Sequence, residues 1–502
     1  MSVGPMLRIS LLAAAAVALV AAATAGCTRK NADFCCTTVE ACERHGGDGE
    51  LVHCPMDSER PYCDNQARTC IAPPGEPCGP DGECDDPATP ICVEGLCVEC
   101  GGAGDCPFSN PVCSEADHQC QSCTDESECA EFADRPFCDR GGCVGCRDGG
   151  DCSVDSQPIC DETERSCRAC RAGAECASGV CDWMGGACVA EDNVLYVATD
   201  GTGSECTREA PCDTIAQALD RAAGPKNWIL MAAGDYAETV LVSGESVRIV
   251  GEEGATLRPS GTDEAVITAT AAANLRISGL TIHDADGNGD GPGDGIYCTN
   301  SGGSPTVVLD RVIIEGNDDQ GIDANSCNLT LGRSVVRDNR RGGLSLDSVD
   351  FDVTNNFIIG NGSGGIVSAG VLVDKNPPTS GRLEHNTIVA NVAQSGSPSG
   401  VQCVLVGSLV TFRNNIIFDN LGSDTQVEGA NCEHTYSVIG PDAVPGDGNV
   451  ATAPDFVSDS NFHLDDGSSG IDAAEDSDVV IDVDGDPRPG SGANDIGADE
   501  RP

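Results

Sequence analysis

The residues best suited to chemistry in this sequence are acidic, and the densest group lies in one glycine-rich stretch. Five oxygen-bearing side chains occur there at short intervals: Asp284, Asp286, Asn288, Asp290 and Asp294. The first six positions match a calcium loop, Asp-x-Asp-x-Asn-Gly, and Gly295 occupies the place of the bidentate glutamate. Hard carboxylate oxygens on a flexible loop suit Ca²⁺, although a solvated acidic insertion has the same pattern. A shorter group, Asp482, Asp484 and Asp486, gives the same two interpretations.

A second candidate site combines acidic and basic residues at a fixed spacing. Asp318 and Asp319 precede Arg340 and Arg341 by 22 residues, and Asp323 follows shortly after the acidic pair. These side chains could form a metal site or an acid/base pair. An exposed ladder of ion pairs explains the same residues without any activity, and this interpretation is favoured because such pairs are common on surfaces.

The same spacing of 22 residues recurs in the apolar pattern around these residues. Val307, Leu329 and Phe351 begin short alternating strands, and Asn317 and Asn339 occupy equivalent corners, as does Asn361. Each repeat reads as strand, corner, strand, asparagine corner, strand. This period is too short for propeller blades, and the repeats lack the sequence pattern of leucine-rich repeats. They therefore predict a parallel β-helix whose inward residues stack in columns. We expect the corner asparagines to hydrogen-bond from coil to coil.

These repeats resemble the right-handed parallel β-helix superfamily that includes the pectate lyases. The segment from Tyr196 to Gly203, followed by Thr214 to Leu219, is similar to the start of bacterial surface β-helix proteins, where a short helix caps the open end. The segments 482–489 and 495–500 resemble the closing part of the "choice-of-anchor Q" group. The resemblance implies an all-β solenoid over residues 193–440 and a closing segment over 441–502.

The resemblance also implies where activity would be found. Pectate-lyase relatives bind Ca²⁺ through clustered Asp and use an Arg as the base, which again points to Asp318, Asp319 and Arg341. Relatives that hydrolyse pectin carry Gly-His-Gly and Arg-Ile-Lys motifs beside an Asp-Asp pair, and only the Asp-Asp pair is present here. His283 and His385, the two histidines beside predicted strands, are interpreted as surface or corner residues.

The part before the solenoid is dominated by cysteine. Residues 27–190 hold 27 of the 33 cysteines, and a four-cysteine unit recurs about every 23 residues. An even number remains once Cys27 is set aside, which favours a disulfide-rich, loop-dominated stalk whose connectivity the spacing leaves open. Cys-x-x-Cys junctions also suit zinc, but the other two cysteines of each unit favour disulfides.

Six further cysteines fall inside the predicted solenoid. Cys298 and Cys327 are 29 residues apart, as are Cys403 and Cys432, so each pair could join neighbouring coils. Cys206 and Cys212 could close a loop near the first coil. We therefore predict three bridges: Cys206–Cys212, Cys298–Cys327 and Cys403–Cys432.

The first residues indicate export. Residues 11–20 form an apolar run too short for a permanent membrane span, and Ala23 to Cys27 resembles a bacterial lipoprotein cleavage box. Residues 1–26 are therefore interpreted as a lipoprotein signal peptide, with Cys27 lipidated and the protein held at the outer membrane by that lipid alone. Thr24 replaces the usual leucine, so simple secretion is the alternative.

The net charge and the absence of several motifs exclude some classes of function. A net charge of -53 would repel phosphate backbones, which excludes nucleic acid as a partner. The sequence has no phosphate-binding glycine loop, Gly-x-Ser-x-Gly elbow or His-Glu-x-x-His. We interpret the chain as a cell-surface protein whose β-helix binds a polysaccharide or a surface partner. The alternative is a Ca²⁺-dependent polysaccharide lyase or a glycoside hydrolase on the same fold.

Overall fold

The computed structural model describes residues 62–64, 69–71, 78, 83–84, 86–93, 95–262, 264–287, 293–363, 369–375, 380–407, 409–422, 425–490 and 492–501. The chain divides between Ala169 and Cys170 into two compact units. The predicted signal peptide 1–26, Cys27, Asn288 and Asp290 lie outside the described residues. The last four-cysteine module, Cys170 to Cys188, belongs to the second unit.

The cysteine-rich part is a series of small antiparallel hairpins, one in each module. The pairs are β1 (Tyr62–Asp64) with β2 (Thr69–Ile71), β3 (Ile91–Val93) with β4 (Leu96–Val98), β5 (Val112–Cys113) with β6 (Cys120–Gln121), β7 (Phe137–Asp139) with β8 (Gly142–Val144), β9 (Ile159–Cys160) with β10 (Cys167–Arg168), and β11 (Cys181–Asp182) with β12 (Ala187–Cys188). Such short hairpins are not stable alone. Their stability must come from the cross-links.

The disulfides follow one rule from Cys78 to Cys188. In each module the first cysteine bonds to the third and the second bonds to the fourth, as in Cys123–Cys138 and Cys129–Cys143. The third and fourth cysteines face each other across the hairpin. Cysteine trios whose sulfur atoms lie close enough for a metal, such as Cys123, Cys129 and Cys143, are thus bonded in disulfides. The zinc interpretation is wrong for these modules.

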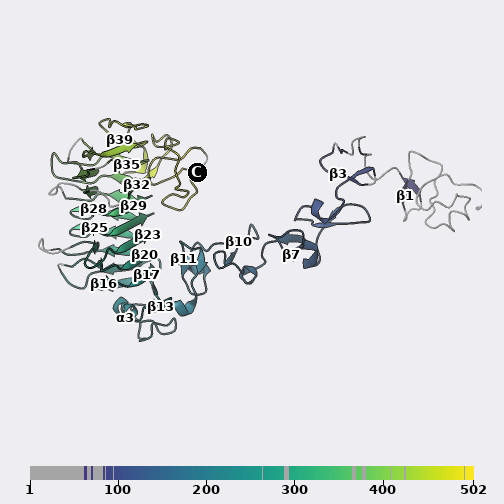
Figure 1. Ribbon diagram of the computed structural model, residues 1–502, viewed down its shortest axis with the longest axis horizontal. Coiled ribbons are helices and arrows are strands. Elements are labelled where there is room, and N and C mark those ends of the chain that lie inside the picture. Colours follow the sequence, from purple (N-terminus) through teal and green to yellow (C-terminus); the bar gives the residue numbers. More distant parts are fainter. Residues whose placement is uncertain are drawn as a thin grey trace, which may run out of the picture. The chain divides into compact units, whose positions relative to one another are not determined.

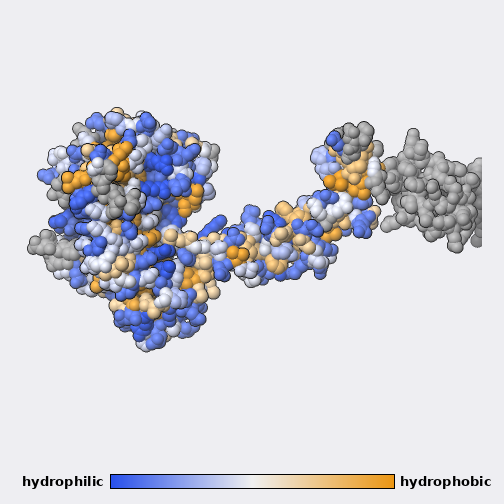
Figure 2. Space-filling view, viewed as in Figure 1, coloured by the Kyte–Doolittle hydropathy of each residue, from blue (hydrophilic) through white to orange (hydrophobic). Residues whose placement is uncertain are grey.

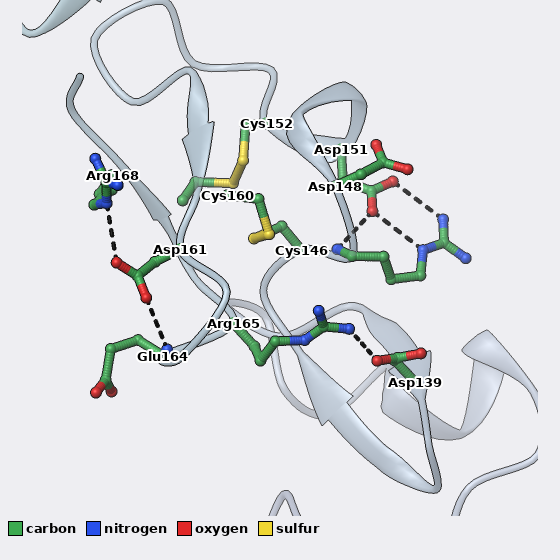
Figure 3. Close-up of a disulfide and its surroundings, with 12 residues drawn as sticks. Asp139, Cys146, Asp148, Asp151, Cys152, Cys160, Asp161, Glu164, Arg165 and Arg168 are labelled. Atoms are coloured by element: carbon green, nitrogen blue, oxygen red, sulfur yellow. Dashed lines mark hydrogen bonds and ion pairs between the residues drawn. A yellow bond between two sulfur atoms is a disulfide. The ribbon is translucent and has the colours of Figure 1, made fainter. Parts of the chain in front are cut away.

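Acidic side chains shape the loops between the hairpins. Asp105, Glu128, Asp151 and Glu175 each stand one position before the second cysteine of a module and accept backbone N–H groups near its first cysteine. They lie in or at the end of short 3-10 helices: η1 (Ala103–Asp105), η2 (Glu126–Cys129), η3 (Gly149–Asp151) and η4 (Gly173–Glu175). Figure 3 shows one such module, where Arg165 also pairs with Asp139 of the preceding hairpin. Part of the negative charge of the chain therefore serves to fix the loops of these modules.

The second unit is a right-handed parallel β-helix of three sheets, as the resemblance implied (Figure 1). The first sheet contains β13 (Val194–Val197), β14 (Trp228–Met231), β17 (Ser246–Gly251), β20 (Asn274–Ser278), β23 (Thr306–Asp310), β26 (Asn328–Gly332), β29 (Asp350–Thr354), β32 (Gly381–Glu384), β35 (Val410–Arg413) and β38 (Cys432–Thr435). Each complete coil contributes one strand to each sheet. In the view of Figure 2, much of the outer face of the coils is hydrophilic, with hydrophobic residues in small groups.

The other two sheets complete each coil. The second sheet contains β15 (Gly234–Ala237), β18 (Ala255–Arg258), β21 (Thr281–His283), β24 (Ile313–Glu315), β27 (Val335–Arg337), β30 (Phe357–Ile359), β33 (Thr387–Val389), β36 (Ile416–Phe418) and β39 (Val438–Gly440). The third contains β16 (Val240–Ser243), β19 (Ile267–Thr270), β22 (Ile296–Thr299), β25 (Gln320–Asn325), β28 (Gly342–Asp347), β31 (Val371–Asp374), β34 (Val401–Val404) and β37 (Val427–Glu428).

The interior is a set of stacked apolar columns. Val307 pairs with Leu329 and Leu329 with Phe351 in the parallel register, and at most 2 % of each residue is exposed. The predicted column is therefore confirmed. Gly381 follows Phe351 in this column, and Phe351 approaches Phe412 with ring centroids 6.1 Å apart. A small residue beside a large one keeps the packing dense along the solenoid.

Two asparagine ladders run between the sheets. The predicted ladder is confirmed: Asn317 and Asn339 each donate their backbone N–H and side-chain amide to the next side-chain oxygen, and Asn361 continues the ladder to Asn391. A second ladder, which the sequence analysis missed, joins residues at the corner between the first and second sheets: Ser334, Asn356, Asn386, Asn415 and Ser437. These bonds satisfy polar groups that are buried at the corners.

Three disulfides fasten the coils, and both ends of the solenoid are covered. The bonds are Cys206–Cys212, Cys298–Cys327 and Cys403–Cys432. At the first coil the short helix α3 (Ile215–Leu219) buries Ile215 and Ala218 in the core. Beyond the last coil, β40 (Phe456–Ser458) and β41 (Asn461–Leu464) form an antiparallel hairpin. None of the helices among the described residues has the length and apolar character needed to cross a membrane.

Candidate functional site

Three carboxyl groups gather where strands of the third sheet begin, and we call Asp294, Asp319 and Asp323 the acidic cluster. Asp294 lies two residues before β22, Asp319 lies immediately before β25, and Asp323 lies within β25. Neighbouring coils are joined here, because the Asp319 N–H donates to the Gly293 carbonyl at 2.9 Å and the Gln320 N–H donates to Asp294 Oδ1 at 3.0 Å. In the sequence, Asp294 belongs to the predicted calcium loop, whereas Asp319 and Asp323 belong to the second candidate site.

Burial and mutual repulsion control the protonation of the cluster. Asp294 is 2 % exposed; burial, with the charges of Asp323 and Asp319, raises its pKa to about 8. Burial also raises the pKa of Asp319 and of Asp323, although Arg341 and the Ser345 hydroxyl oppose these shifts. Asp294 is therefore largely protonated at neutral pH. A divalent cation would relieve the repulsion and displace this proton.

The two arginines stacked beside the cluster are both paired. Arg341 Nη1 lies 3.2 Å from Asp319 Oδ2, and Arg340 Nη1 lies 3.7 Å from Asp318 Oδ1. These pairs join neighbouring coils, as an offset of 22 residues requires. Both arginine side chains are about half exposed or more, which limits the stability each pair contributes.

The other acidic residues proposed as Ca²⁺ ligands have different surroundings. Asp284 and Asp286 are exposed, and Asp284 Oδ2 lies 3.0 Å from His283 Nδ1. Asp482 is fully buried, and its Oδ1 accepts the N–H groups of Asp484, Gly485 and Asp486. Its other oxygen accepts the Glu500 N–H at 3.0 Å. The Asp482 carboxylate is thus used to fold its own loop, while Asp484 contacts His463.

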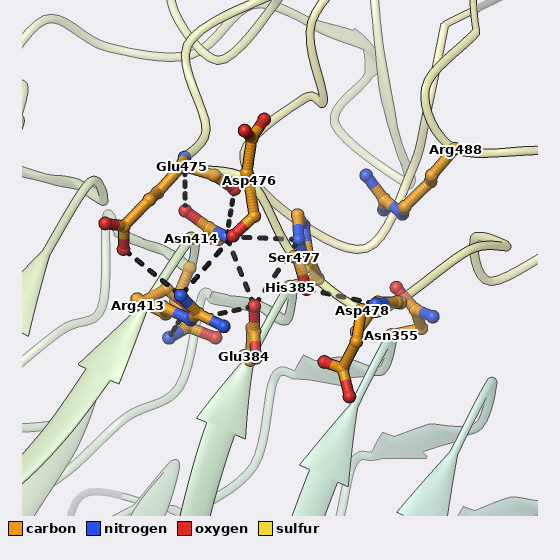
Figure 4. Close-up of polar contacts among 12 residues, drawn as sticks. Asn355, Glu384, His385, Arg413, Asn414, Glu475, Asp476, Ser477, Asp478 and Arg488 are labelled. Atoms are coloured by element: carbon orange, nitrogen blue, oxygen red, sulfur yellow. Dashed lines mark hydrogen bonds and ion pairs between the residues drawn. The ribbon is translucent and has the colours of Figure 1, made fainter.

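A buried polar network fastens the closing segment to the first sheet (Figure 4). The Glu384 carboxylate lies 2.7 Å from Arg382 Nε and 3.0 Å from Arg413 Nε. Asn414 exchanges two hydrogen bonds with the backbone of Glu475, at 3.0 and 2.9 Å. His385 occupies a corner, as predicted, but is fully buried, and its Nδ1 donates to the Asp495 carbonyl. Burial lowers the pKa of His385 well below its usual value, so this histidine is neutral.

The fold and these contacts define a parallel β-helix protein with a disulfide-rich N-terminal part. No family model matches the chain, and no curated protein matches it. Among solved structures, the β-helix of pectate lyase Pel9A is similar, with 17 % sequence identity and a TM-score of 0.37. The match covers 62 % of this chain and all of that one.

Proposed function

We propose that the β-helix unit binds an acidic polysaccharide through Ca²⁺ held by the acidic cluster. The observation that carries this proposal is the gathering of three repelling carboxyl groups, the buried Asp294 and the partly buried Asp319 and Asp323, with one guanidinium, that of Arg341, beside them. Ca²⁺ takes six to eight oxygen ligands, so three carboxylates would leave positions open for those of a uronate chain. Such a polymer carries carboxylates at regular intervals, which suits the regular spacing of the coils along the solenoid.

Cleavage of the polysaccharide is the second candidate, and the arginines argue against it. The resemblance implies an Arg as the base of a lyase, and the two arginines on this surface, Arg340 and Arg341, are both paired with carboxylates. A paired guanidinium is a poor proton acceptor because ion pairing favours its charged form. The motifs of pectin hydrolases are also absent from the sequence. A binding role therefore has the stronger support.

Export is indicated by the dense disulfides, which persist in oxidising compartments. We further propose that a lipid on Cys27 anchors the protein at the outer membrane, since residues 23–27 resemble a lipoprotein cleavage box. Labelled palmitate should be incorporated into the wild-type protein in a lipoprotein-processing host and not into Cys27→Ser. Equal labelling of both proteins would place the lipid at another residue, and labelling of neither would leave secretion as the better description.

Calorimetric titration with Ca²⁺ alone tests the metal site. We expect binding at pH 7 with release of about one proton, because the pKa of Asp294 is raised to about 8. Buffers of different ionisation enthalpy report this proton. Below that pKa the apparent affinity should fall about tenfold for each pH unit, since the cation competes with one proton.

Two matched variants locate the Ca²⁺ site. Asp319→Asn should weaken Ca²⁺ binding by at least about tenfold, while Asp284→Asn, at an exposed carboxylate, should leave it unchanged. If Asp284→Asn alone weakened binding, the glycine-rich loop and not the acidic cluster would hold the metal. Absence of any heat at millimolar Ca²⁺ would remove the proposal.

A further inference from the structure

The outer face of the first sheet carries a groove that is separate from the acidic cluster. Its volume is about 750 Å³, within the range of small-ligand sites, about 300 to 1,000 Å³. One side is formed by Trp183 and Met184 of the last cysteine module, and the other by the segment from Asp478 to Gly485. Strands β23, β26 and β29 form its floor.

The side formed by the cysteine module is fixed to the β-helix. Val180 packs in one buried cluster with Tyr196 and Trp228, and the Tyr196 hydroxyl donates to the Ser178 carbonyl at 3.0 Å. Arg276 Nη1 lies 3.1 Å from Met184 Sδ. These contacts hold the β11–β12 turn, and with it the indole of Trp183, against the sheet. The groove is therefore a formed feature of the second unit.

The floor of the groove is unusually rich in arginine for so acidic a protein. Arg311 Nε and the Arg333 guanidinium both pair with Asp310, whose side chain is 3 % exposed. Arg333 also lies 5.8 Å from the ring centroid of Trp183. The charge of Asp310 is thus balanced by its two partners, and among the described residues the terminal nitrogens of Arg311 make no hydrogen bond or ion pair besides the contact of Nε with Asp310. Arg171 adds an exposed guanidinium at the edge.

The opposite side contributes an unsatisfied acceptor. Asn355 is 4 % exposed and lines the groove, and its Nδ2 donates to the Ile481 carbonyl at 2.7 Å. Its Oδ1 is buried without a hydrogen-bond partner in the described parts of the chain. A buried acceptor left unpaired destabilises the fold, and rotation of this amide toward the groove would let a donor on a bound ligand satisfy it. The segment itself is held in place by the pairing of Asp478 with Arg382.

We propose that this groove binds an anionic sugar, without Ca²⁺. The Trp183 ring offers a face on which a sugar ring stacks, as aromatic side chains do at binding sites with both apolar and polar contacts. Arg311 and Arg171 offer charged donors to a carboxylate or sulfate, and a guanidinium binds both in bidentate fashion. Rotated toward the groove, the Asn355 amide would accept a hydroxyl of the same sugar through Oδ1. The site is distinct in position and chemistry from the acidic cluster.

Tryptophan fluorescence of the full chain in EDTA tests this proposal. The chain has only two tryptophans, and Trp228 is 9 % exposed, so a ligand in the groove should change the emission of Trp183. We expect saturable changes with digalacturonate or with a sulfated disaccharide, and the two titrations show which anion is preferred. The neutral disaccharide galactobiose should bind at least about tenfold more weakly.

Variants separate this site from its alternatives. Arg311→Gln, and separately Arg171→Gln at an exposed position, should each weaken binding about tenfold, and Trp183→Phe should remove the signal. Asp319→Asn should change nothing, which distinguishes this site from the proposed Ca²⁺ site. No saturable change with either anionic sugar would overturn the proposal, as would equal binding of the neutral sugar. Equal competition by inorganic sulfate would reduce the groove to an anion site and also overturn it.

Discussion

Replacing Asn361 with alanine is expected to lower the free energy of unfolding of the β-helix by about 4 kcal/mol. Asn361 is fully buried, and its Oδ1 accepts both the backbone N–H and the side-chain amide of Asn339, at 3.1 and 2.9 Å. Its Nδ2 donates to Val336 O and to Asn391 Oδ1, each at 2.9 Å. Alanine would leave buried donors and acceptors unpaired on both neighbouring coils, at about 1–3 kcal/mol for each group.

Urea unfolding followed by circular dichroism measures this effect on the full chain. Asn274→Ala is the matched control, because Asn274 lies on β20 of the same solenoid but is exposed. That variant should lie within about 0.5 kcal/mol of the wild type. Equal midpoints for both variants would mean that the ladder contributes little, and the stability of the corners would then need another explanation.

Reduction is expected to unfold the cysteine-rich modules of the first unit and to leave the β-helix folded. Among described residues 78–169, every buried hydrophobic residue is a cysteine, as at Cys100, Cys129 and Cys146. The disulfides there close loops of 13 to 15 residues, each worth about 3 kcal/mol, and no separate apolar core would replace them. The β-helix instead buries stacked Val, Ile and Leu side chains, and its three disulfides join residues that are largely buried.

Limited proteolysis with and without dithiothreitol, read by mass spectrometry, tests this difference. We expect cleavage between residues 78 and 169 only after reduction, with a protected fragment that begins near residue 170. A chelator serves as the control and should have no effect. Protection of the modules after reduction, or cleavage caused by the chelator, would contradict a disulfide-based core.

The sequence was sufficient for the repeat but not for every contact that depends on it. The column through Val307, Leu329 and Phe351 is visible because three successive coils have equal length, which keeps a fixed offset in register. The second ladder was missed because the coils of equal length place Val312, Ser334 and Asn356 at its position. Three unlike residues at one offset give no sign that their polar groups hydrogen-bond from coil to coil.

The acidic cluster and the groove depend on contacts that no repeat predicts. Asp294 ends an acidic insertion, and its spacing from the next coil differs from the period that aligned Asp319 with Arg341. The groove combines the β-helix with Trp183 and with the segment around Asp478, and neither belongs to the repeat. Burial of Asp482 likewise depends on backbone N–H groups that only the folded loop presents.

The central claim is that Ca²⁺ at the acidic cluster creates a binding site for an acidic polysaccharide. Its most direct test is calorimetric titration of the Arg311→Gln variant with oligogalacturonate, in Ca²⁺ and in EDTA. This variant is used because its sugar binding at the groove is weakened. We predict binding at least about tenfold tighter in Ca²⁺ than in EDTA, loss of this difference when Asp319→Asn is added, and no rise in the ultraviolet absorbance of unsaturated products. Equal heats in Ca²⁺ and EDTA would contradict the claim, and product formation abolished by Arg341→Gln would show a lyase instead.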